Sequence, residues 1–405
     1  MIKKYIKLFT ASVLCGLFLL TLVNALPIAP MQKNVLSHVW NDNYLKDVIP
    51  YYEGTNLATW TDHLMLAIAI TDEPGDNPIE ESLISYQPHY EGNYVPELIL
   101  KEMANGNPDV INTSYGRYWH GYLVYLKPLL LFCNYFDIQI FNTLLCFSAL
   151  LLVTYKIYND KKLKKYSLRF FISYLFICPF IIGISLQFSS VFYISLLGAY
   201  LITRLDKKDS SYLIFSFIGI LTCFMDFLTY PMITLCVPLT LYCLKYKDEI
   251  SIKDVIVQSI FWGMSYTLFW ASKWILTSLF TEYNIIKDTI DQIFLRSGTN
   301  IDGAKVNRID ALSSTFDILT NKAYLLFLIL CLTVYVSNAL KFKNLIFLPS
   351  KTVIALIAIS IIPLIWLVVT ANHAIFHAFF TYRNLIGFIF PLICLVPTID
   401  TTNNH

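Results

Sequence analysis

Residues 352–371 read TVIALIAISIIPLIWLVVTA, a run of twenty residues without a charged side chain. An α-helix needs an apolar run of about this length to cross the hydrocarbon core of a bilayer. Hydrophobic runs of spanning length recur along the chain from residue 5 to about residue 399. The sequence therefore predicts an all-α polytopic membrane protein and disfavours a water-soluble cytosolic enzyme.

The composition agrees with a membrane protein. Hydrophobic residues make up 56% of the 405 residues and charged residues only 14%, whereas soluble chains carry about 25% charged residues. Most of the nine cysteines lie inside apolar runs, and we expect buried thiols there without disulfides or a thiolate metal site. The basic residues are dispersed in short loops, so the net charge of +2 does not point to nucleic acid.

We predict about ten membrane-spanning helices in one integral-membrane domain that covers residues 1–405. They are expected at 5–25, 138–157, 167–186, 188–204, 211–228, 231–245, 255–279, 323–341, 352–371 and 384–399. The first run follows three lysines and could be a cleaved signal peptide, but its length favours a retained helix. Either alternative places residue 27 outside.

The distribution of lysine and arginine predicts the orientation. With the N-terminus inside, the short inner segments hold 18 of the 30 basic residues, as the positive-inside rule requires. The protein is then integral to the plasma membrane, with its active face outside the cytoplasm. Six histidines face outward, together with three further charged residues: His38, His63, His89, His120, His373, His377, Asp62, Asp226 and Arg383.

Two outward segments are long, 27–137 and 280–322. Within the first, residues 56–71 carry apolar side chains at helical spacing, which predicts an amphipathic helix near the membrane. Residues 117–133 are aromatic and apolar but contain Lys127 and Pro128. This segment fits an interfacial or re-entrant helix better than a full span.

Asp62 is the first candidate for chemistry, because it lies on the predicted helix that follows the first span. Partial burial raises the pKa of a carboxyl group towards neutrality, which suits a general base. His63 follows it directly and is expected to contact the substrate. The alternative is that Asp62 is a solvated residue or a helix cap, since aspartate is favoured in the first turn of a helix.

Asp226 and Lys273 lie at the outer ends of predicted spans. A charge at the edge of the hydrocarbon region is costly and by default functional, so Asp226 is the second catalytic candidate. The alternative is an aspartate at a helix end that faces water. Lys273 lies between two tryptophans, Trp270 and Trp274, and either binds an anion or extends to the membrane interface.

His373 and His377 are four residues apart, so on a helix they share one face. This spacing can ligate a metal, but no third ligand is evident, so we predict no metal site and leave a divalent metal open as a cofactor. Phosphate or a sugar hydroxyl would also fit. Tyr382 and Arg383 follow as substrate-binding candidates, because arginine suits two-point binding of phosphate. The alternative is an ordinary polar loop.

Arg117, Tyr118 and His120 belong to the aromatic segment RYWHGY at 117–122. Aromatic rings beside arginine and histidine suit sugar stacking with hydrogen bonding, and they equally suit an aromatic belt at the membrane interface. The chain has no P-loop, no dinucleotide fingerprint and no GxSxG motif, which disfavours nucleotide hydrolysis.

The architecture resembles the GT-C class of integral-membrane glycosyltransferases, which have many spans, a large first outward loop with interfacial helices, and an essential acidic residue soon after the first span. Asp62 takes that place here, although His63 follows where some of these families have a second acidic residue. The segments RYWHGY, DFLTYP, WASKW and HxxxHxxFTYR also look like a group of bacterial membrane proteins associated with surface-polysaccharide synthesis.

This resemblance implies an inverting transfer of a sugar from a polyprenyl-phosphate donor to a cell-envelope glycan or lipid acceptor at the outer face. Asp62 would be the base, and Asp226 the second carboxylate or an acceptor ligand. Lys273 and Arg383 would stabilise the leaving phosphate, while His120 and His377 would position donor or acceptor.

Three alternatives remain beside this enzyme. A transporter or flippase for lipid-linked sugars would need polar residues at mid-membrane depth and access from both sides. A polysaccharide polymerase or ligase would share the outer-face chemistry but use a polymeric donor. A structural membrane subunit would have no active site.

Overall fold

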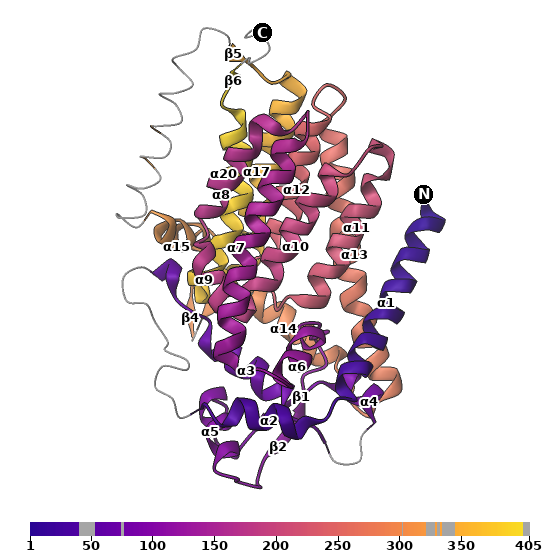
Figure 1. The fold of residues 1–405 in the computed structure, drawn as a ribbon, viewed down its shortest axis with the longest axis vertical. Helices are drawn as coiled ribbons and strands as arrows, with labels where there is room; N and C mark the ends of the chain where they lie inside the picture. The colour runs from indigo at the N-terminus through magenta and orange to yellow at the C-terminus, as the bar shows by residue number, and fades with distance from the viewer. Residues whose placement is uncertain are drawn as a thin grey trace.

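The computed structural model describes residues 1–39, 53–73, 77–301, 303–320, 329, 333 and 345–399. Long helices run side by side through the molecule, and short helices with a small hairpin cover its lower end (Figure 1). The long axis of the molecule is therefore the direction in which the chain would cross a membrane.

The helix bundle is built from segments throughout the chain. Its helices are α1 (Ile2–Asn24), α7 (Tyr135–Asn159), α8 (Ser167–Leu175), α9 (Pro179–Ile184), α10 (Leu186–Thr203), α11 (Ser211–Met225), α12 (Met232–Lys245), α13 (Ile252–Phe280), α17 (Ser350–Val369) and α20 (Ile386–Leu395). Short 3-10 turns precede or join some of them: η2 (Lys164–Tyr166), η3 (Lys208–Ser210) and η4 (Tyr382–Leu385).

The first segment that the sequence predicts to face outward forms a layer across one end of this bundle. It contains α2 (Ile28–Leu36), η1 (Glu53–Thr55), α3 (Thr59–Ala69), α4 (Pro78–Ile84), β1 (Tyr86–His89), α5 (Pro96–Ala104), β2 (Ile111–Ser114) and α6 (Leu123–Leu130). Strands β1 and β2 pair antiparallel, with Tyr86 opposite Ser114. We call this set of elements the outward layer.

The second long segment and the chain before the last span add further short elements. They are α14 (Ile286–Ser297), β3 (Asn300–Ile301), β4 (Ala304–Lys305), α15 (Asp310–Leu319), α18 (Ala371–Phe376) and α19 (Ala378–Thr381). Strands β3 and β4 form a two-stranded hairpin, and β5 (Leu345–Ile346) pairs with β6 (Thr398–Ile399) at the opposite end.

Six segments in the described part of the chain are long and apolar enough to cross a membrane. They are α1, α7, α10, Lys208–Met225, α17 and Ala378–Leu395. An all-α membrane protein is thus confirmed at this level, while ten spans stay a prediction. Helix α12 is apolar but shorter, and the span expected at 323–341 lies outside the described residues except for 329 and 333.

The span expected at 167–186 is broken in two. Helix α8 ends at Leu175, and α9 begins at Pro179 after Cys178 adopts a φ of 52°. Proline lacks the N–H that would bond to the preceding turn of a helix, and it is favoured at the first helical position. Residues 167–186 therefore contain two short helices, α8 with nine residues and α9 with six, in place of one predicted span.

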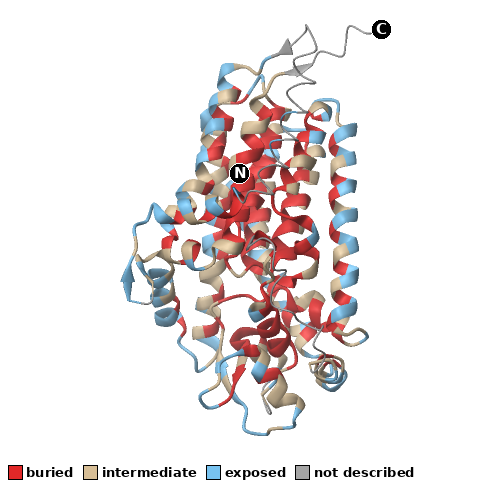
Figure 2. Ribbon diagram, turned by 90° about the vertical axis from the view of Figure 1, so that its left-hand side faces the viewer, coloured by how far each residue is buried: buried red, intermediate tan, exposed pale blue. Residues whose placement is uncertain are grey.

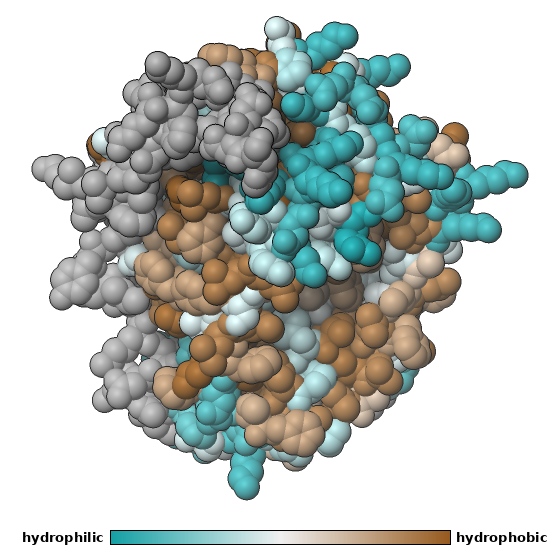
Figure 3. Space-filling model, turned by 45° about the horizontal axis from the view of Figure 1, so that its top comes forward, coloured by the Kyte–Doolittle hydropathy of each residue, from teal (hydrophilic) through white to brown (hydrophobic). Residues whose placement is uncertain are grey.

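The buried residues lie along the centre of the bundle, and exposed residues cover its outside (Figure 2). Much of that outer surface is apolar. On α7, for example, Phe141, Leu144 and Leu151 are exposed, as expected of side chains that face lipid. Hydrophilic residues gather at the end opposite the outward layer, above an apolar flank (Figure 3).

Helix α3 confirms the helix predicted at 56–71 but not its surface position. Nine of its eleven residues are buried, because α5, α6, α10 and β1 pack around it. The two exceptions are Trp60, which is about half exposed, and Thr61, which is partly buried. The helix is therefore buried on nearly all sides instead of on one apolar face, and Asp62 and His63 lie inside the protein, while its place near the membrane stays a prediction. Helix α6, with eight residues, is as short as predicted for an interfacial segment.

Buried polar contacts fasten the outward layer to the bundle. The ammonium group of Lys127 on α6 donates to the side chain of Asn24 at the end of α1 (2.8 Å). Lys273 on α13 donates to the backbone carbonyl of Ser82 on α4 (2.5 Å). Because buried charge-assisted hydrogen bonds are strong, these lysines fix the layer against the helix ends.

Candidate functional site: a strained turn between α11 and α12

Asp226 closes a tight turn at the end of α11. Its carboxylate accepts hydrogen bonds from the backbone N–H of Thr229 (3.0 and 3.1 Å) and from the Thr229 hydroxyl (2.5 Å). Burial raises the pKa of Asp226 to about 6. Within the turn Leu228 adopts a φ of 65°, a left-handed conformation that is costly for a leucine. The aspartate thus holds a strained backbone at the edge of the membrane.

This turn joins two segments that are far apart in sequence. The ring of Phe227 packs against those of Tyr118 (5.4 Å between centroids) and His120 (5.2 Å). The next carbonyl, that of Leu228, accepts a hydrogen bond from Nε2 of His373 (2.6 Å). The predicted aromatic segment and the predicted histidine segment therefore meet at the turn of Asp226, the second catalytic candidate.

The aromatic segment 115–122 is held in a second strained conformation. His120 has a φ of 54°, and the next residue, Gly121, donates its N–H to the carbonyl of Phe224 (2.8 Å). A Cβ at Gly121 would lie 2.4 Å from the Phe224 ring, so only glycine fits against α11. Burial lowers the pKa of His120 to about 3. The neutral ring donates a hydrogen bond from Nε2 to the backbone carbonyl of Tyr115 (3.0 Å).

Arg117, in the same aromatic segment, is held both by its backbone carbonyl and by its guanidinium group. Its backbone carbonyl accepts hydrogen bonds from the indole N–H groups of Trp270 (2.5 Å) and Trp274 (3.0 Å) on α13. Its guanidinium lies 4.4 Å from the centre of the Tyr115 ring and forms an ion pair with Asp288 on α14 (2.9 Å). Tyr118 stacks on Trp270, so the tryptophans act as supports for this segment.

His373 and His377 lie together, as their spacing predicted, with ring centres 4.8 Å apart. Both rings face Arg296, whose Nη1 lies 2.7 Å from Nδ1 of His373 and 3.3 Å from Nε2 of His377. A guanidinium between the two nitrogens competes with a metal ion for the same lone pairs. Among the described residues no group of three His, Cys, Asp or Glu could hold a metal ion.

Asp62 is on α3, and its carboxylate lies at the N-terminal end of α10. One oxygen of its carboxylate accepts the backbone N–H of Gln187 (3.0 Å), and the other accepts the N–H of Leu186 (3.2 Å) and the hydroxyl of Tyr135 (2.5 Å). A carboxylate at a helix N-terminus satisfies otherwise unpaired N–H groups. Burial raises the pKa of Asp62 to about 6, although the hydrogen bond from Tyr135 lowers it.

Among the remaining predicted site residues, Arg383, Tyr382 and Lys273 donate hydrogen bonds to backbone carbonyls of the protein. Arg383 is fully buried and donates to the carbonyls of Gly54 (3.0 Å) and Phe379 (3.1 Å), and Tyr382 donates to Gly54 as well (3.0 Å). Lys273 is fully buried against Ser82. His63 is buried near Glu97 and Lys101 of α5, and burial lowers its pKa to about 4. This geometry favours anchoring roles for these side chains over phosphate binding.

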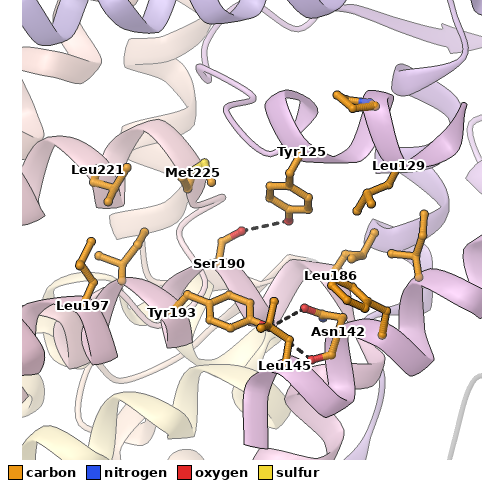
Figure 4. Close-up of a pocket in the computed structure, with 14 residues that line it drawn as sticks. Tyr125, Leu129, Asn142, Leu145, Leu186, Ser190, Tyr193, Leu197, Leu221 and Met225 are labelled. Carbon is orange, nitrogen blue, oxygen red and sulfur yellow. Dashed lines mark hydrogen bonds between the residues drawn. The ribbon is translucent and has the colours of Figure 1, made fainter. Parts of the chain in front are cut away.

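A cavity of about 590 Å³ lies between α6, α7, α10 and α11 (Figure 4). Its lining is almost entirely apolar: Tyr125, Pro128, Leu129, Ile138, Phe141, Asn142, Leu145, Leu186, Ser190, Tyr193, Ile194, Leu197, Leu221 and Met225. Its polar groups are paired with one another: Tyr125 with Ser190 (3.2 Å), and Tyr193 with Asn142 (2.8 Å).

The cavity connects the lipid-facing flank to the region of the aspartates. Phe141 and Leu145 line it and are 57% and 44% exposed on the outside of α7. At its other end Leu186 lines it while donating its N–H to Asp62, and Met225 lines it directly before Asp226. The cavity wall therefore runs from the exposed side of α7 to Leu186, whose N–H bonds Asp62, and to Met225, the residue before Asp226.

Three residues of this region were not predicted from the sequence. Arg296 reads as an ordinary basic residue in the last turn of a helix, and Asp288 as one acidic residue of a polar loop. Tyr135 lies at the start of a span, where a tyrosine is typical of the interface. Arg296 contacts a residue 77 positions away, Asp288 one that is 171 positions away and Tyr135 one that is 73 positions away. No local sequence pattern signals these contacts.

Comparison of this chain with family models, with curated proteins and with solved structures finds no significant match. The fold and the site therefore define the class: an α-helical membrane protein with a strained polar turn at one end of the bundle and an apolar cavity beside it.

Proposed function

We propose that this protein is a membrane glycosyltransferase that moves a sugar from a polyprenyl-phosphate donor to a cell-envelope glycan or lipid acceptor. One observation carries the proposal: the apolar cavity reaches from the lipid-facing flank of α7 to Leu186, behind which the buried carboxylate of Asp62 lies. A donor with a hydrocarbon tail could occupy such a cavity without leaving the bilayer.

The cavity suits the hydrocarbon part of that donor. Its volume of about 590 Å³ lies within the range of about 300–1,000 Å³ that ligand pockets usually have. Its polar side chains are hydrogen-bonded to each other, so they offer little to a polar headgroup. The sugar and its phosphate would then lie at the outer end, near the turn that contains Asp226.

Asp62 is the base in this proposal. The acceptor hydroxyl attacks the anomeric carbon, the bond from that carbon to the phosphate oxygen breaks, and the phosphate leaves with the bonding electrons. Asp62 takes the hydroxyl proton. A carboxyl group with a pKa of about 6 is mostly ionised at neutral pH and is a stronger base than a solvent-exposed aspartate. Asp226 positions the turn that presents Phe227 and Leu228 to the aromatic and histidine segments.

A flippase for lipid-linked sugars is the second candidate. The observation in its favour is the pair formed by Asn142 on α7 and Tyr193 on α10, two polar side chains inside predicted spans and in the cavity wall. A transporter needs polar groups at such depth. Both functions use a lipid-linked sugar, and they differ in whether the sugar leaves its phosphate.

The test is a rescue experiment in the native host. The gene is deleted, surface glycans and glycolipids are analysed by mass spectrometry, and the strain is complemented with wild type, Asp62→Asn or Asp109→Asn. Asp109 is an exposed aspartate of the same outward segment and serves as the matched control. We expect a missing sugar that wild type and Asp109→Asn restore and Asp62→Asn does not. Equal rescue by Asp62→Asn would remove Asp62 as the base.

A further inference from the structure

Arg296 is a cation without a carboxylate partner among the described residues. Its Nη1 faces the two histidine rings, and no aspartate or glutamate that the structure describes lies within ion-pair distance of it. Its Nε–H is buried and has no hydrogen-bond acceptor in the described part of the protein. The guanidinium therefore retains both its charge and part of its donor capacity.

The two histidines orient Arg296 without neutralising it. Burial, together with the charge of Arg296, lowers the pKa of His377 to about 4, and burial with the charges of His377 and Arg296 lowers the pKa of His373 well below its usual range, so both rings are neutral at physiological pH. The Nε2–H of His373 donates to the Leu228 carbonyl, which leaves Nδ1 free to accept from Arg296. Neutral acceptors fix the direction of a guanidinium and leave its positive charge available.

A second guanidinium belongs to the same set of contacts: that of Arg117 lies 4.4 Å from the centre of the Tyr115 ring and forms an ion pair with Asp288 on α14, the helix that carries Arg296. Arg117 and Arg296 both act on the hydroxyl of Tyr115, whose pKa burial raises to about 12 and both arginines lower. Arg117 has one ionic partner, the carboxylate of Asp288, whose side chain is 48% exposed. Two guanidinium groups, one carboxylate and neutral imidazoles leave the cluster with a net positive charge.

Helix α14 has the exposed apolar face of a helix that lies at a membrane surface. It contributes Asp288 and Arg296 towards the site, while Ile290, Ile293 and Phe294 are exposed on its outside. An amphipathic helix with an exposed apolar face fits the headgroup boundary of a bilayer. Lipid phosphates lie at this depth, so a cation there faces phosphate chemistry.

We propose that Arg296 and Arg117 form a binding site for a phosphate group beside Tyr115. Guanidinium groups match the geometry of phosphate oxygens and bind them with strong, charge-assisted hydrogen bonds. If the phosphate belongs to the sugar donor, this inference rests on the proposed function. As an anion site of the protein it stands on the contacts of Arg296 alone.

The site is tested by direct binding to the full-length protein in phosphatidylcholine nanodiscs. The probe is tritiated geranylgeranyl phosphate, and the competitors are inorganic phosphate and geranylgeraniol. The variants are Arg296→Gln, Arg296→Lys and, as a matched control, Arg308→Gln. Arg308 is an exposed arginine that donates to the carbonyls of Val368 and Val369, away from the cluster.

We expect Arg296→Gln to weaken binding of the probe by about 10- to 100-fold, as loss of a charge-assisted contact implies. Arg296→Lys keeps the charge but not the planar geometry and should weaken binding less. Arg308→Gln should bind as wild type does. Competition by inorganic phosphate as strong as by the unlabelled lipid would assign the site to free phosphate. A clear advantage of the lipid would assign it to a headgroup.

Unchanged binding in folded Arg296→Gln, or competition by geranylgeraniol equal to that by geranylgeranyl phosphate, would overturn the proposal. Folding is checked by thermal unfolding, and Arg296→Lys gives the result if the glutamine variant is unstable. Binding needs no turnover, so its failure is separate from that of the proposed function. Loss of probe binding in Arg296→Gln together with full restoration of the missing sugar would confirm the phosphate site and show that the phosphate it binds is not that of the sugar donor.

Discussion

Asp62 combines an anchoring contact with a chemical property. Its carboxylate accepts two N–H groups of α10 and the hydroxyl of Tyr135, which makes it part of the scaffold, while burial raises its pKa to about 6. The sequence singled out Asp62 as a helix cap or a base; the contacts with α10 show the cap, and the role as base stays a prediction. The sequence could not show that the capped helix is a different one, because Leu186 is 124 residues away.

The pH dependence of sugar transfer should report on Asp62. If it is the base, the rate falls as the pH drops through about 6, because the protonated carboxyl cannot accept a proton. Tyr135→Phe removes a hydrogen bond that lowers this pKa, so the fall should begin at a higher pH. The measurement is the transfer rate in isolated membranes between pH 5 and 8. An acid limb that does not move would argue against Asp62.

Gly121 tests the packing of the aromatic segment against α11. Gly121→Ala forces a Cβ to within 2.4 Å of the Phe224 ring, and overpacking of this kind costs about 1–3 kcal/mol. We expect a lower unfolding temperature of the purified protein. Gly263→Ala is the control, because its Cβ meets nothing within 4 Å and alanine favours a helix by about 1 kcal/mol. Equal effects of the two changes would contradict the close approach.

At the scale of elements, the boundaries of the long helices follow the apolar runs. Helices α1, α7, α10 and α17 begin and end within a few residues of the predicted spans, because desolvation of the backbone leaves only a helix as an option in lipid. The break at Cys178 was missed although Pro179 is visible, since proline also occurs inside α12, α17 and α20 without ending them.

The turn between α11 and α12 depends on Thr229. Thr229→Val keeps the shape of the side chain but leaves the buried carboxylate of Asp226 without the hydroxyl donor, which costs about 1.5–3 kcal/mol. We expect thermal destabilisation and a weaker rescue of the surface glycan. Thr229→Ser retains the hydroxyl and should behave close to wild type. If valine were tolerated as well as serine, the turn would not depend on this bond.

At the scale of the whole molecule, the polar candidates occupy one end of the bundle. The outward layer, α14 and the turn of Asp226 all lie there, and β5 and β6 lie at the opposite end (Figure 1). The sequence placed these residues on one side through the distribution of basic loops. It could not predict which of them touch, because Arg296 and Leu228 are joined by His373 only through the packing of α14 and α18.

The orientation of this bundle is a prediction that reporter fusions can test. With the N-terminus inside, a green fluorescent protein fused before residue 1 should fluoresce. Alkaline phosphatase inserted at the tip of the outward layer, after Gly106, should be active because that enzyme needs export. Gly106 has a φ of 74° in an exposed loop, so the insertion should not disturb the fold. Inactive phosphatase with a folded protein would reverse the topology.

The most direct measurement follows the phosphate. Lipids extracted from the deletion strain, which should accumulate the donor, are incubated with purified protein in nanodiscs, and mass spectrometry counts polyprenyl phosphate with and without its sugar. Wild type should convert the sugar-bearing lipid to free polyprenyl phosphate, and Asp62→Asn should not. A donor that stays intact with wild type, in the presence of acceptor extracted from the same cells, would contradict a glycosyltransferase and favour the flippase.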